Sequence, residues 1–150
     1  HIGVIIANKN GRNLAKFVTD FKQKSPETKI RLMGHSLGAH VILSTIKNLA
    51  KNTKNKGIIE AVYLFGGSIP SDALSAKNAS YVQKIVSKKI RNYYSPHDEV
   101  LHVVDDWNWV DTPIGYKGAH GKTIPKYHQT MVKPKNHRFA SYAAVLRSFP

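Results

Sequence analysis

The sequence Lys29-Ile-Arg-Leu-Met-Gly-His-Ser-Leu-Gly-Ala-His-Val-Ile-Leu43 decides the fold of this chain. Its first residues alternate apolar and polar side chains as a strand does, and its last residues have the apolar spacing of a helix. Between the two patterns, Gly34 and Gly38 bracket Ser36 in a G-x-S-x-G motif. A serine at such a strand-to-helix turn is typical of a nucleophile elbow. A Ser/Gly turn before an ordinary helix is the simpler alternative, and the flanking patterns favour the elbow.

The elbow places steric and electrostatic demands on its residues. Ser36 on so tight a turn adopts strained backbone angles, and we expect side chains in place of Gly34 and Gly38 to collide with the neighbouring strand and helix. The Ser36 hydroxyl then projects at the N-terminus of a helix, where the helix dipole favours a developing negative charge. The backbone N–H of Leu37, the residue after the nucleophile, is the expected donor of an oxyanion hole.

Short apolar runs alternate with helical patterns along the rest of the chain. This order predicts parallel β-α-β units with right-handed crossovers, whose functional side chains lie at the carboxyl ends of the strands. Residues 107–125 combine aromatic residues, glycines and prolines without a clear period, which predicts an irregular insertion at the rim of the site. The expected strands are 2–7, the residues just before the elbow, 58–65, 89–94 and 127–132, and the expected helices are 13–24, 41–49, 77–87 and 139–146.

The charge of the chain is strongly positive. It carries 23 lysines and arginines against 9 aspartates and glutamates, a formal net charge of +14. Such a charge favours weak association with anionic surfaces such as a membrane, although a solvated lysine-rich surface has the same composition. The lysines are scattered and lack interleaved aromatic residues, which argues against specific nucleic-acid binding.

The composition also limits the chemistry. The chain has no cysteine, which excludes a disulfide, a thiolate metal site and a cysteine nucleophile. No histidine pair has the spacing of a metal motif such as H-E-x-x-H, so we expect neither a metal nor a cofactor. No run is long and apolar enough to cross a membrane and no signal peptide is visible, which leaves the compartment open, with the cytoplasm slightly favoured.

A serine nucleophile needs a general base, and the base needs an orienting carboxylate. Asp98 is the favoured acid because it directly follows the expected strand 89–94 in a Ser-Pro-x-Asp turn, whereas the adjacent Glu99 would point elsewhere. Asp72 is the main rival, because it lies beyond the preceding strand, but it does not follow that strand directly. Three further acidic residues fall in or beside the irregular segment and are expected on the surface or as loop caps: Asp105, Asp106 and Asp111.

The base is expected after the acid in the chain, and His137 is the favoured candidate. It lies in a loop between the last expected strand and the final helix, from which an imidazole can reach Ser36. His120, in a glycine-containing segment, is the runner-up and could instead line the pocket. The other histidines near the motif or after the acid are expected in packing or structural positions: His35, His40, His102 and His128.

The elbow sequence resembles that of lipase-like members of the α/β-hydrolase superfamily. Three further segments are similar to the poorly characterised hydrolase family of the transmembrane-and-coiled-coil-domain proteins: 62–66, 92–101 and 113–115. In that family the acid follows the strand after the one that carries Leu-Phe-Gly, and a histidine with a nearby tyrosine lies close to the end of the domain. The resemblance therefore implies Asp98 as the acid, and His137 with Tyr142 as the histidine and the tyrosine.

The resemblance also implies the architecture: an α/β-hydrolase-like fold with a mainly parallel sheet flanked by helices, in a single domain over residues 1–150. At 150 residues the chain is short for a complete sheet of this kind, so we expect a minimal version or one that lacks its N-terminal strands. If residues 2–7 form the strand just before the elbow unit, the segment with the second oxyanion-hole donor precedes His1.

Together these features predict a serine hydrolase that cleaves a carboxylic ester. Ser36 attacks the carbonyl carbon, His137 accepts and returns the proton, and Asp98 orients the imidazole. A lipid ester is the first choice, from the elbow type and the basic surface together, and a small soluble ester is nearly as well supported. The alternative is a catalytically inactive domain that keeps the elbow as a turn and binds partners through its basic surface.

Overall fold

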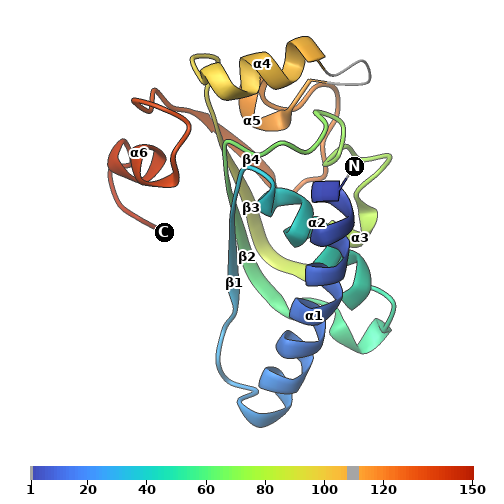
Figure 1. Ribbon diagram of the computed structural model, residues 1–150. Coiled ribbons are helices and arrows are strands. Elements are labelled where there is room, and N and C mark those ends of the chain that lie inside the picture. The colour runs from blue at the N-terminus through green and yellow to red at the C-terminus, as the bar shows by residue number, and fades with distance from the viewer. Residues whose placement is uncertain (1, 108–111) are drawn as a thin grey trace.

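A four-stranded parallel sheet forms the centre of the molecule (Figure 1). The computed structural model describes residues 2–107 and 112–150. The strands lie in the order β1 (Arg31–His35), β2 (Ile59–Phe65), β3 (Val86–Tyr94) and β4 (Tyr127–Met131). Because all neighbouring pairs are parallel, the strands end at one edge of the sheet, the carboxyl edge, and begin at the opposite, amino edge. The α/β class with a parallel sheet flanked by helices is confirmed.

Helices cover both faces of this sheet and its carboxyl edge. Three lie on one face, α6 lies on the other, and α4 and α5 lie beyond the carboxyl ends of the strands (Figure 1). A short 3₁₀ helix, η1 (Thr53–Asn55), lies in the connection from α2 to β2. The α-helices are α1 (Ile2–Lys24), α2 (Gly38–Leu49), α3 (Ser80–Ile85), α4 (Glu99–Trp107), α5 (Ile114–Lys117) and α6 (Phe139–Ala144).

Two apolar clusters hold the sheet between its helices. The larger cluster packs the side chains of β2 and β3, including Leu64 and Ile90, against Ile46 of α2. The smaller cluster lies on the other face, where Phe65 at the end of β2 packs with Tyr142 of α6. Burial of these apolar side chains is the main favourable contribution to folding, and it fixes the ends of β1, β2 and β3 relative to α2 and α6.

The predicted strand at residues 2–7 is wrong, because these residues form the first turns of α1. Small and apolar side chains recur at helical spacing on one face of α1, where Ala7, Gly11, Ala15 and Val18 are buried. Gly11 permits close packing, since a Cβ atom there would lie 2.3 Å from the Ser44 Oγ of α2. The β-branched run suggested a strand, but the helical stripe that continues beyond it governs the structure.

The segment after Asp98 is also more regular than expected. Residues 99–107 form α4, so Asp105 and Asp106 lie on a helix and not in an irregular loop. After the undescribed residues 108–111, which include Asp111, the chain forms the single turn α5 and two isolated bridges, Pro70 to Pro113 and Ser75 to Thr123. In the described ranges, 2–107 and 112–150, no helix has both the length and the apolar character needed to span a membrane.

Candidate active site

Ser36 lies on the turn between β1 and α2, at the carboxyl edge of the sheet. Its φ of 56° is the one positive φ of a non-glycine residue among those described, as expected for a strained elbow. Three hydrogen bonds hold the turn: Ser36 N–H donates to the Phe65 carbonyl at 3.1 Å, and the Ser36 carbonyl accepts from the N–H groups of Ser68 and Ala39, each at 3.2 Å. The end of β2 and the first turn of α2 thus fix the serine backbone.

The two motif glycines do not have the same role. A Cβ atom on Gly34 would lie 2.6 Å from Ile42 Cδ1 and 2.9 Å from the Gly38 carbonyl oxygen, so no larger residue fits there without movement. A Cβ atom on Gly38 would meet no heavy atom within 4 Å. The steric prediction is confirmed for Gly34 and wrong for Gly38, because α2 turns the Gly38 position toward open space.

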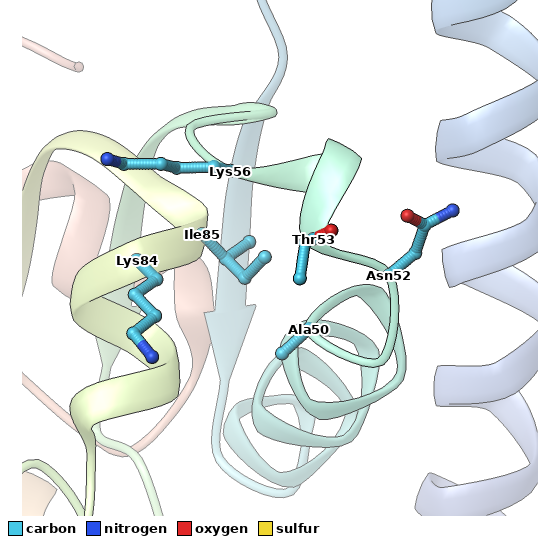
Figure 2. Close-up of a pocket in the computed structure, with 6 residues that line it drawn as sticks. All are labelled: Ala50, Asn52, Thr53, Lys56, Lys84 and Ile85. Carbon is cyan, nitrogen blue, oxygen red and sulfur yellow. The ribbon is translucent and has the colours of Figure 1, made fainter.

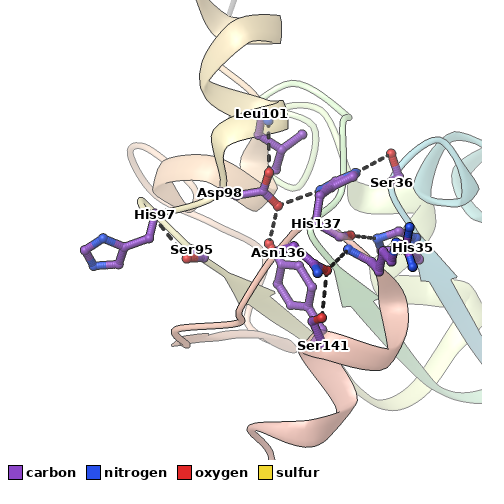
Figure 3. A network of polar contacts seen from close by, with 11 residues as sticks. His35, Ser36, Ser95, His97, Asp98, Leu101, Asn136, His137 and Ser141 are labelled. Atoms are coloured by element: carbon purple, nitrogen blue, oxygen red, sulfur yellow. Dashed lines mark hydrogen bonds and ion pairs between the residues drawn. The ribbon is translucent and has the colours of Figure 1, made fainter.

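Hydrogen bonds join the three predicted residues in one chain (Figure 3). The Ser36 Oγ lies 2.9 Å from the Nε2 atom of His137, and the Nδ1 atom of His137 lies 2.6 Å from the Oδ2 atom of Asp98. A carboxylate only accepts hydrogen bonds, so Nδ1 carries the proton and Nε2 of the neutral ring accepts from the Ser36 hydroxyl. This tautomer is the one in which an imidazole can take a proton from serine.

Asp98 is held as a buried carboxylate. It follows β3 at the start of α4, its side chain is fully buried, and its Oδ1 atom accepts from the Leu101 N–H at 3.0 Å. Its Oδ2 atom accepts from His137 and from the hydroxyl of Tyr142, each at 2.6 Å. Burial alone would raise the pKa of Asp98, but the hydrogen bonds from His137, Tyr142 and the Leu101 N–H outweigh it and hold the pKa below its ordinary value.

Tyr142 is part of the polar network, a role that sequence reasoning did not assign to it. It is fully buried on α6, and its hydroxyl shares the Asp98 Oδ2 atom with His137. Burial and the adjacent carboxylate raise the pKa of this phenol far above its ordinary value, so it stays a hydrogen-bond donor. The resemblance implied a tyrosine near the histidine, but nothing in the sequence indicated that it would bind the acid.

The main chain at His137 is also fixed. The Nε2 atom of His35 donates to the carbonyl oxygen of His137, and the centroids of the two rings are 4.8 Å apart (Figure 3). The Oδ1 atom of Asn136 accepts from the N–H of Arg138 at 2.9 Å and from the hydroxyl of Ser141 at 2.7 Å. Burial lowers the pKa of His35, which favours a neutral ring beside His137. His35, expected as a packing residue, thus contacts the base loop directly.

The alternative candidates for the acid and the base contact other residues and not Ser36. Asp72 accepts a hydrogen bond at its carbonyl from the Asn78 amide at 3.1 Å, and His120 is exposed with its backbone N–H 3.4 Å from the Ser71 carbonyl. His102 Nδ1 contacts the Tyr116 hydroxyl at 2.7 Å, and its Nε2 lies 3.5 Å from Asp106. His128 lies exposed on β4. Ser36 is thus brought together with Asp98 and His137, not with these residues.

Leu37, whose backbone N–H is the expected oxyanion-hole donor, follows Ser36 directly at the start of α2. No backbone carbonyl in the described part of the chain accepts this N–H. The expected place of the second donor depended on a strand at residues 2–7, and that argument fails because these residues belong to α1.

Within residues 2–107 and 112–150, no three His, Asp or Glu side chains come together in a way that could hold a metal. A pocket of about 440 Å³ lies beside Asp98 and is lined by Pro96, His97, Asp98, Glu99, His102 and Tyr116. The side chain of His97, which lines this pocket, points away from Ser36 (Figure 3), and Ser36 and His137 are not among the lining residues.

The fold and the hydrogen-bonded chain define an α/β protein with a serine, a histidine and an aspartate joined at the carboxyl edge of its sheet. Residues 1–111 match the family described as "Protein of unknown function (DUF726)", and the chain belongs to that family. The matched region contains Ser36 and Asp98 and ends before His137.

Two curated relatives carry names that mention membranes. The "Transmembrane and coiled-coil domain-containing protein STS1" of Oryza sativa subsp. japonica is 30% identical over 97 residues, which are 65% of this chain and 14% of that protein. The "Uncharacterized membrane protein F35D11.3" of Caenorhabditis elegans is 38% identical over 72 residues, 48% of this chain and 11% of that protein. The chain thus spans a small part of the length of these relatives. No solved structure matches the chain.

Proposed function

We propose that this protein is a serine hydrolase of the α/β-hydrolase superfamily that cleaves a carboxylic ester. The observation that carries the proposal is the continuous hydrogen-bond chain from the Ser36 hydroxyl through His137 to the buried Asp98 carboxylate. Its order in the sequence, serine then acid then base, is the order of that superfamily. The same features support the narrower resemblance to the hydrolase family of the transmembrane-and-coiled-coil-domain proteins.

The proposed reaction uses each atom of the chain in turn. The Ser36 Oγ attacks the ester carbonyl carbon while its proton passes to the Nε2 atom of His137. The negative charge on the tetrahedral oxygen faces the N–H of Leu37. The intermediate collapses as His137 returns the proton to the leaving alcohol, which breaks the ester bond and leaves an acyl group on Ser36. Water then repeats the attack, and His137 again accepts and returns the proton, which releases the acid.

Asp98 supports this cycle electrostatically. Its lowered pKa keeps the carboxylate ionised at neutral pH, where it stabilises the imidazolium that forms when His137 takes the serine proton. Because Nδ1 stays bonded to Asp98 throughout, the ring keeps the orientation that directs Nε2 toward Ser36. No cofactor enters this scheme.

A lipid ester is the first proposed substrate, and a small soluble ester is the second. The elbow sequence around Ser36, which resembles that of lipases, supports a lipase-like activity. The net charge of +14 supports association with anionic membrane surfaces. The names of both relatives support the same proposal, since one is called a membrane protein and the other a transmembrane and coiled-coil domain-containing protein. Specific nucleic-acid binding is not proposed, because the lysines lack interleaved aromatic residues.

A catalytically inactive scaffold is the second candidate function. The observation that favours it is the formal net charge of +14, which suits binding of anionic partners without catalysis. Such a protein would keep the Ser36 turn and the Asp98 network for stability and bind anionic partners through its lysines.

Ester hydrolysis by matched serine variants tests the proposal. The chain is assayed with a short-chain and a long-chain nitrophenyl ester, as wild type, as Ser36→Ala, and as Ser87→Ala, an exposed serine at the start of β3. We expect Ser36→Ala to lower kcat/KM by about 10⁶-fold and Ser87→Ala to leave it unchanged. No hydrolysis by the wild type, or equal hydrolysis by Ser36→Ala, would support the scaffold. Preference for the longer ester would support a lipid substrate.

A further inference from the structure

Half of the 18 lysines of this chain lie at the edge of the sheet opposite Ser36. They come from segments that precede the strands, namely the end of α1, the connections to β1 and β2, the end of α3 with the start of β3, and the residue before β4. In a parallel sheet all these segments lie at the amino edge. The lysines there are Lys22, Lys24, Lys29, Lys51, Lys54, Lys56, Lys84, Lys88 and Lys126, and the acidic residues are Glu27 and Glu60.

The carboxyl edge carries surface charges of both signs. Asp72 follows β2, and Glu99, Asp105 and Asp106 belong to α4, beyond the carboxyl ends of the strands, but exposed lysines lie at this edge too: Lys117, Lys133 and Lys135. The positive charge of the chain is therefore not spread evenly over its surface. It forms a field that is strongest at the amino edge, which gives the molecule an electrostatic orientation toward an anionic surface.

Three of these lysines are exposed and firmly placed. In the part of the chain that the structure describes, the ammonium groups of Lys54, Lys56 and Lys84 form no ion pair. Their backbone is fixed, because the Asn52 side chain accepts from the Lys54 N–H at 3.0 Å and the Gly57 N–H donates to the Lys84 carbonyl at 2.9 Å. Their charges are thus held at this edge without being neutralised.

The lysine heads do not converge on a single ligand. Lys56 and Lys84 line a pocket of about 250 Å³, and Figure 2 shows their ammonium groups apart from one another, with Ile85, Thr53 and Ala50 to one side of both. The apolar centre lacks the convergent donors that one phosphate group needs. Separate cations on one edge match instead a surface that presents many anions, as a bilayer does.

The chemistry around Lys54, Lys56 and Lys84 also argues against a nucleic-acid partner. Three neighbouring pockets at this edge have lysines on their rims and contain no arginine and no aromatic side chain, whereas the pocket that contains Arg31, Phe17 and Phe21 lies away from these three lysines, along α1 and β1. Arginine forks and stacking aromatic rings are the usual means of nucleic-acid recognition. We propose that the amino edge, centred on Lys54, Lys56 and Lys84, docks on an anionic phospholipid bilayer and leaves Ser36 on the side away from it.

The docking surface locates the membrane association proposed above and is independent of ester hydrolysis. It adds a consequence for the substrate, since an ester that reaches Ser36 arrives from the side opposite the bound bilayer. Docking by this edge therefore does not itself support a lipid of that bilayer as the substrate, and the support for a lipid ester rests on the elbow sequence. The Ser36→Ala variant should therefore bind vesicles as the wild type does, so that loss of docking and loss of catalysis are observed separately.

Vesicle co-sedimentation tests the docking surface. The chain is mixed with phosphatidylcholine vesicles, with or without phosphatidylserine, at low and high ionic strength. We expect binding to the anionic vesicles only, and loss of binding at high salt. The combined variant Lys54→Ala, Lys56→Ala, Lys84→Ala should lower the partition coefficient by about a hundredfold, or about fivefold for each lysine. The matched control, Lys117→Ala, Lys133→Ala, Lys135→Ala, removes exposed lysines at the carboxyl edge and should have a much smaller effect.

Several results would overturn the proposal. Equal binding by the amino-edge variant and the wild type, with an unchanged thermal transition, would show that these lysines do not dock. An equal loss in the carboxyl-edge control would show that only total charge matters. Competition by inorganic phosphate, beyond that of chloride at the same ionic strength, would indicate a single phosphate site. Tighter binding of short duplex DNA than of vesicles would indicate a nucleic-acid partner.

Discussion

The hydroxyl of Tyr142 donates to the same Asp98 oxygen that accepts the proton-bearing nitrogen of His137. We predict that Tyr142→Phe, which keeps the ring, lowers the free energy of unfolding by about 2 kcal/mol at neutral pH, because a buried carboxylate loses a hydrogen bond. Urea unfolding monitored by circular dichroism measures this change. The same substitution raises the pKa of Asp98 toward its ordinary value, because a donor to the charged form is lost.

The pH dependence of the destabilisation by Tyr142→Phe is the control for this prediction. The pKa of Asp98 is lower in the folded state than in the unfolded state, so its ionisation contributes stability above the unfolded pKa of about 3.9. That contribution is lost as the pH falls through the folded pKa. The stability difference between wild type and Tyr142→Phe should therefore shrink in acid. An equal difference at neutral and at strongly acidic pH would contradict a charge-assisted hydrogen bond.

Gly34 and Gly38 form a matched pair of substitutions at the elbow. We predict that Gly34→Ala destabilises the protein by about 1–3 kcal/mol, because its Cβ would press on Ile42 and on a backbone carbonyl. Gly38→Ala should change the free energy of unfolding by less than about 0.5 kcal/mol, since its Cβ points into open space. Thermal unfolding of both variants measures the contrast, and equal destabilisation would contradict the packing described for the turn.

Much of the site could be predicted at the scale of the residue. The rule that active residues follow parallel strands selected Ser36 and Asp98, and the loop before the final helix selected His137. The contacts of Tyr142 and His35 could not be predicted, because they depend on how α6 lies against the end of β1. The prediction that a side chain at position 38 would collide with its surroundings was wrong for a similar reason, since the direction of α2 decides where a Cβ atom would point.

At the scale of the element, the close packing of α1 on α2 depends on Gly11. A Cβ atom there would lie 2.3 Å from Ser44 Oγ and 2.9 Å from the Thr45 backbone nitrogen. We predict that Gly11→Ala lowers the free energy of unfolding by about 2 kcal/mol, even though alanine favours a helix by up to about 1 kcal/mol. Chemical unfolding measures the change.

Two further variants distinguish the effect of packing between α1 and α2 from the effect of the helix propensity of alanine. Asn10→Ala, at an exposed neighbouring position of α1, should be neutral or slightly stabilising. Combining Gly11→Ala with Ser44→Gly should cost less than the sum of the two single changes, because the colliding Cβ of Ser44 is gone. Simple additivity in this double-mutant cycle would contradict direct contact between Gly11 and Ser44.

The elements most easily predicted were those buried on both sides. The apolar run of β2, which is buried along its whole length, and the apolar stripe of α2 gave clear patterns. The parallel order followed from the alternation of strand and helix patterns. In β3 only Val86, Ile90 and Asn92 are buried, so its pattern was weaker. The first turns of α1 have a β-branched sequence, and helical packing overrode that local preference. Helix α4 could not be predicted from its apolar spacing, because Val100, Val103 and Val104 are exposed and only Leu101 among its aliphatic residues is buried.

At the scale of the whole molecule, the candidate site exists only when the sheet has formed. Ser36 and His137 are separated by 101 positions in the sequence, and the chain passes through β2, β3 and β4 between them. The acid is delivered by β3, between the other two. The sheet thus brings three distant segments of the chain together at its carboxyl edge. Half of the lysines lie at the opposite, amino edge, in the segments that precede the strands.

Covalent labelling by a fluorophosphonate tests the central claim most directly, because it requires an activated serine and no knowledge of the substrate. Intact-mass measurement and peptide mapping should find one adduct on Ser36. The adduct should be absent in Ser36→Ala, formed far more slowly in His137→Ala, and unchanged in Ser87→Ala. A wild-type chain that remains unlabelled while folded, or an adduct that persists in Ser36→Ala, would contradict the assignment of Ser36 as the nucleophile of a hydrolase.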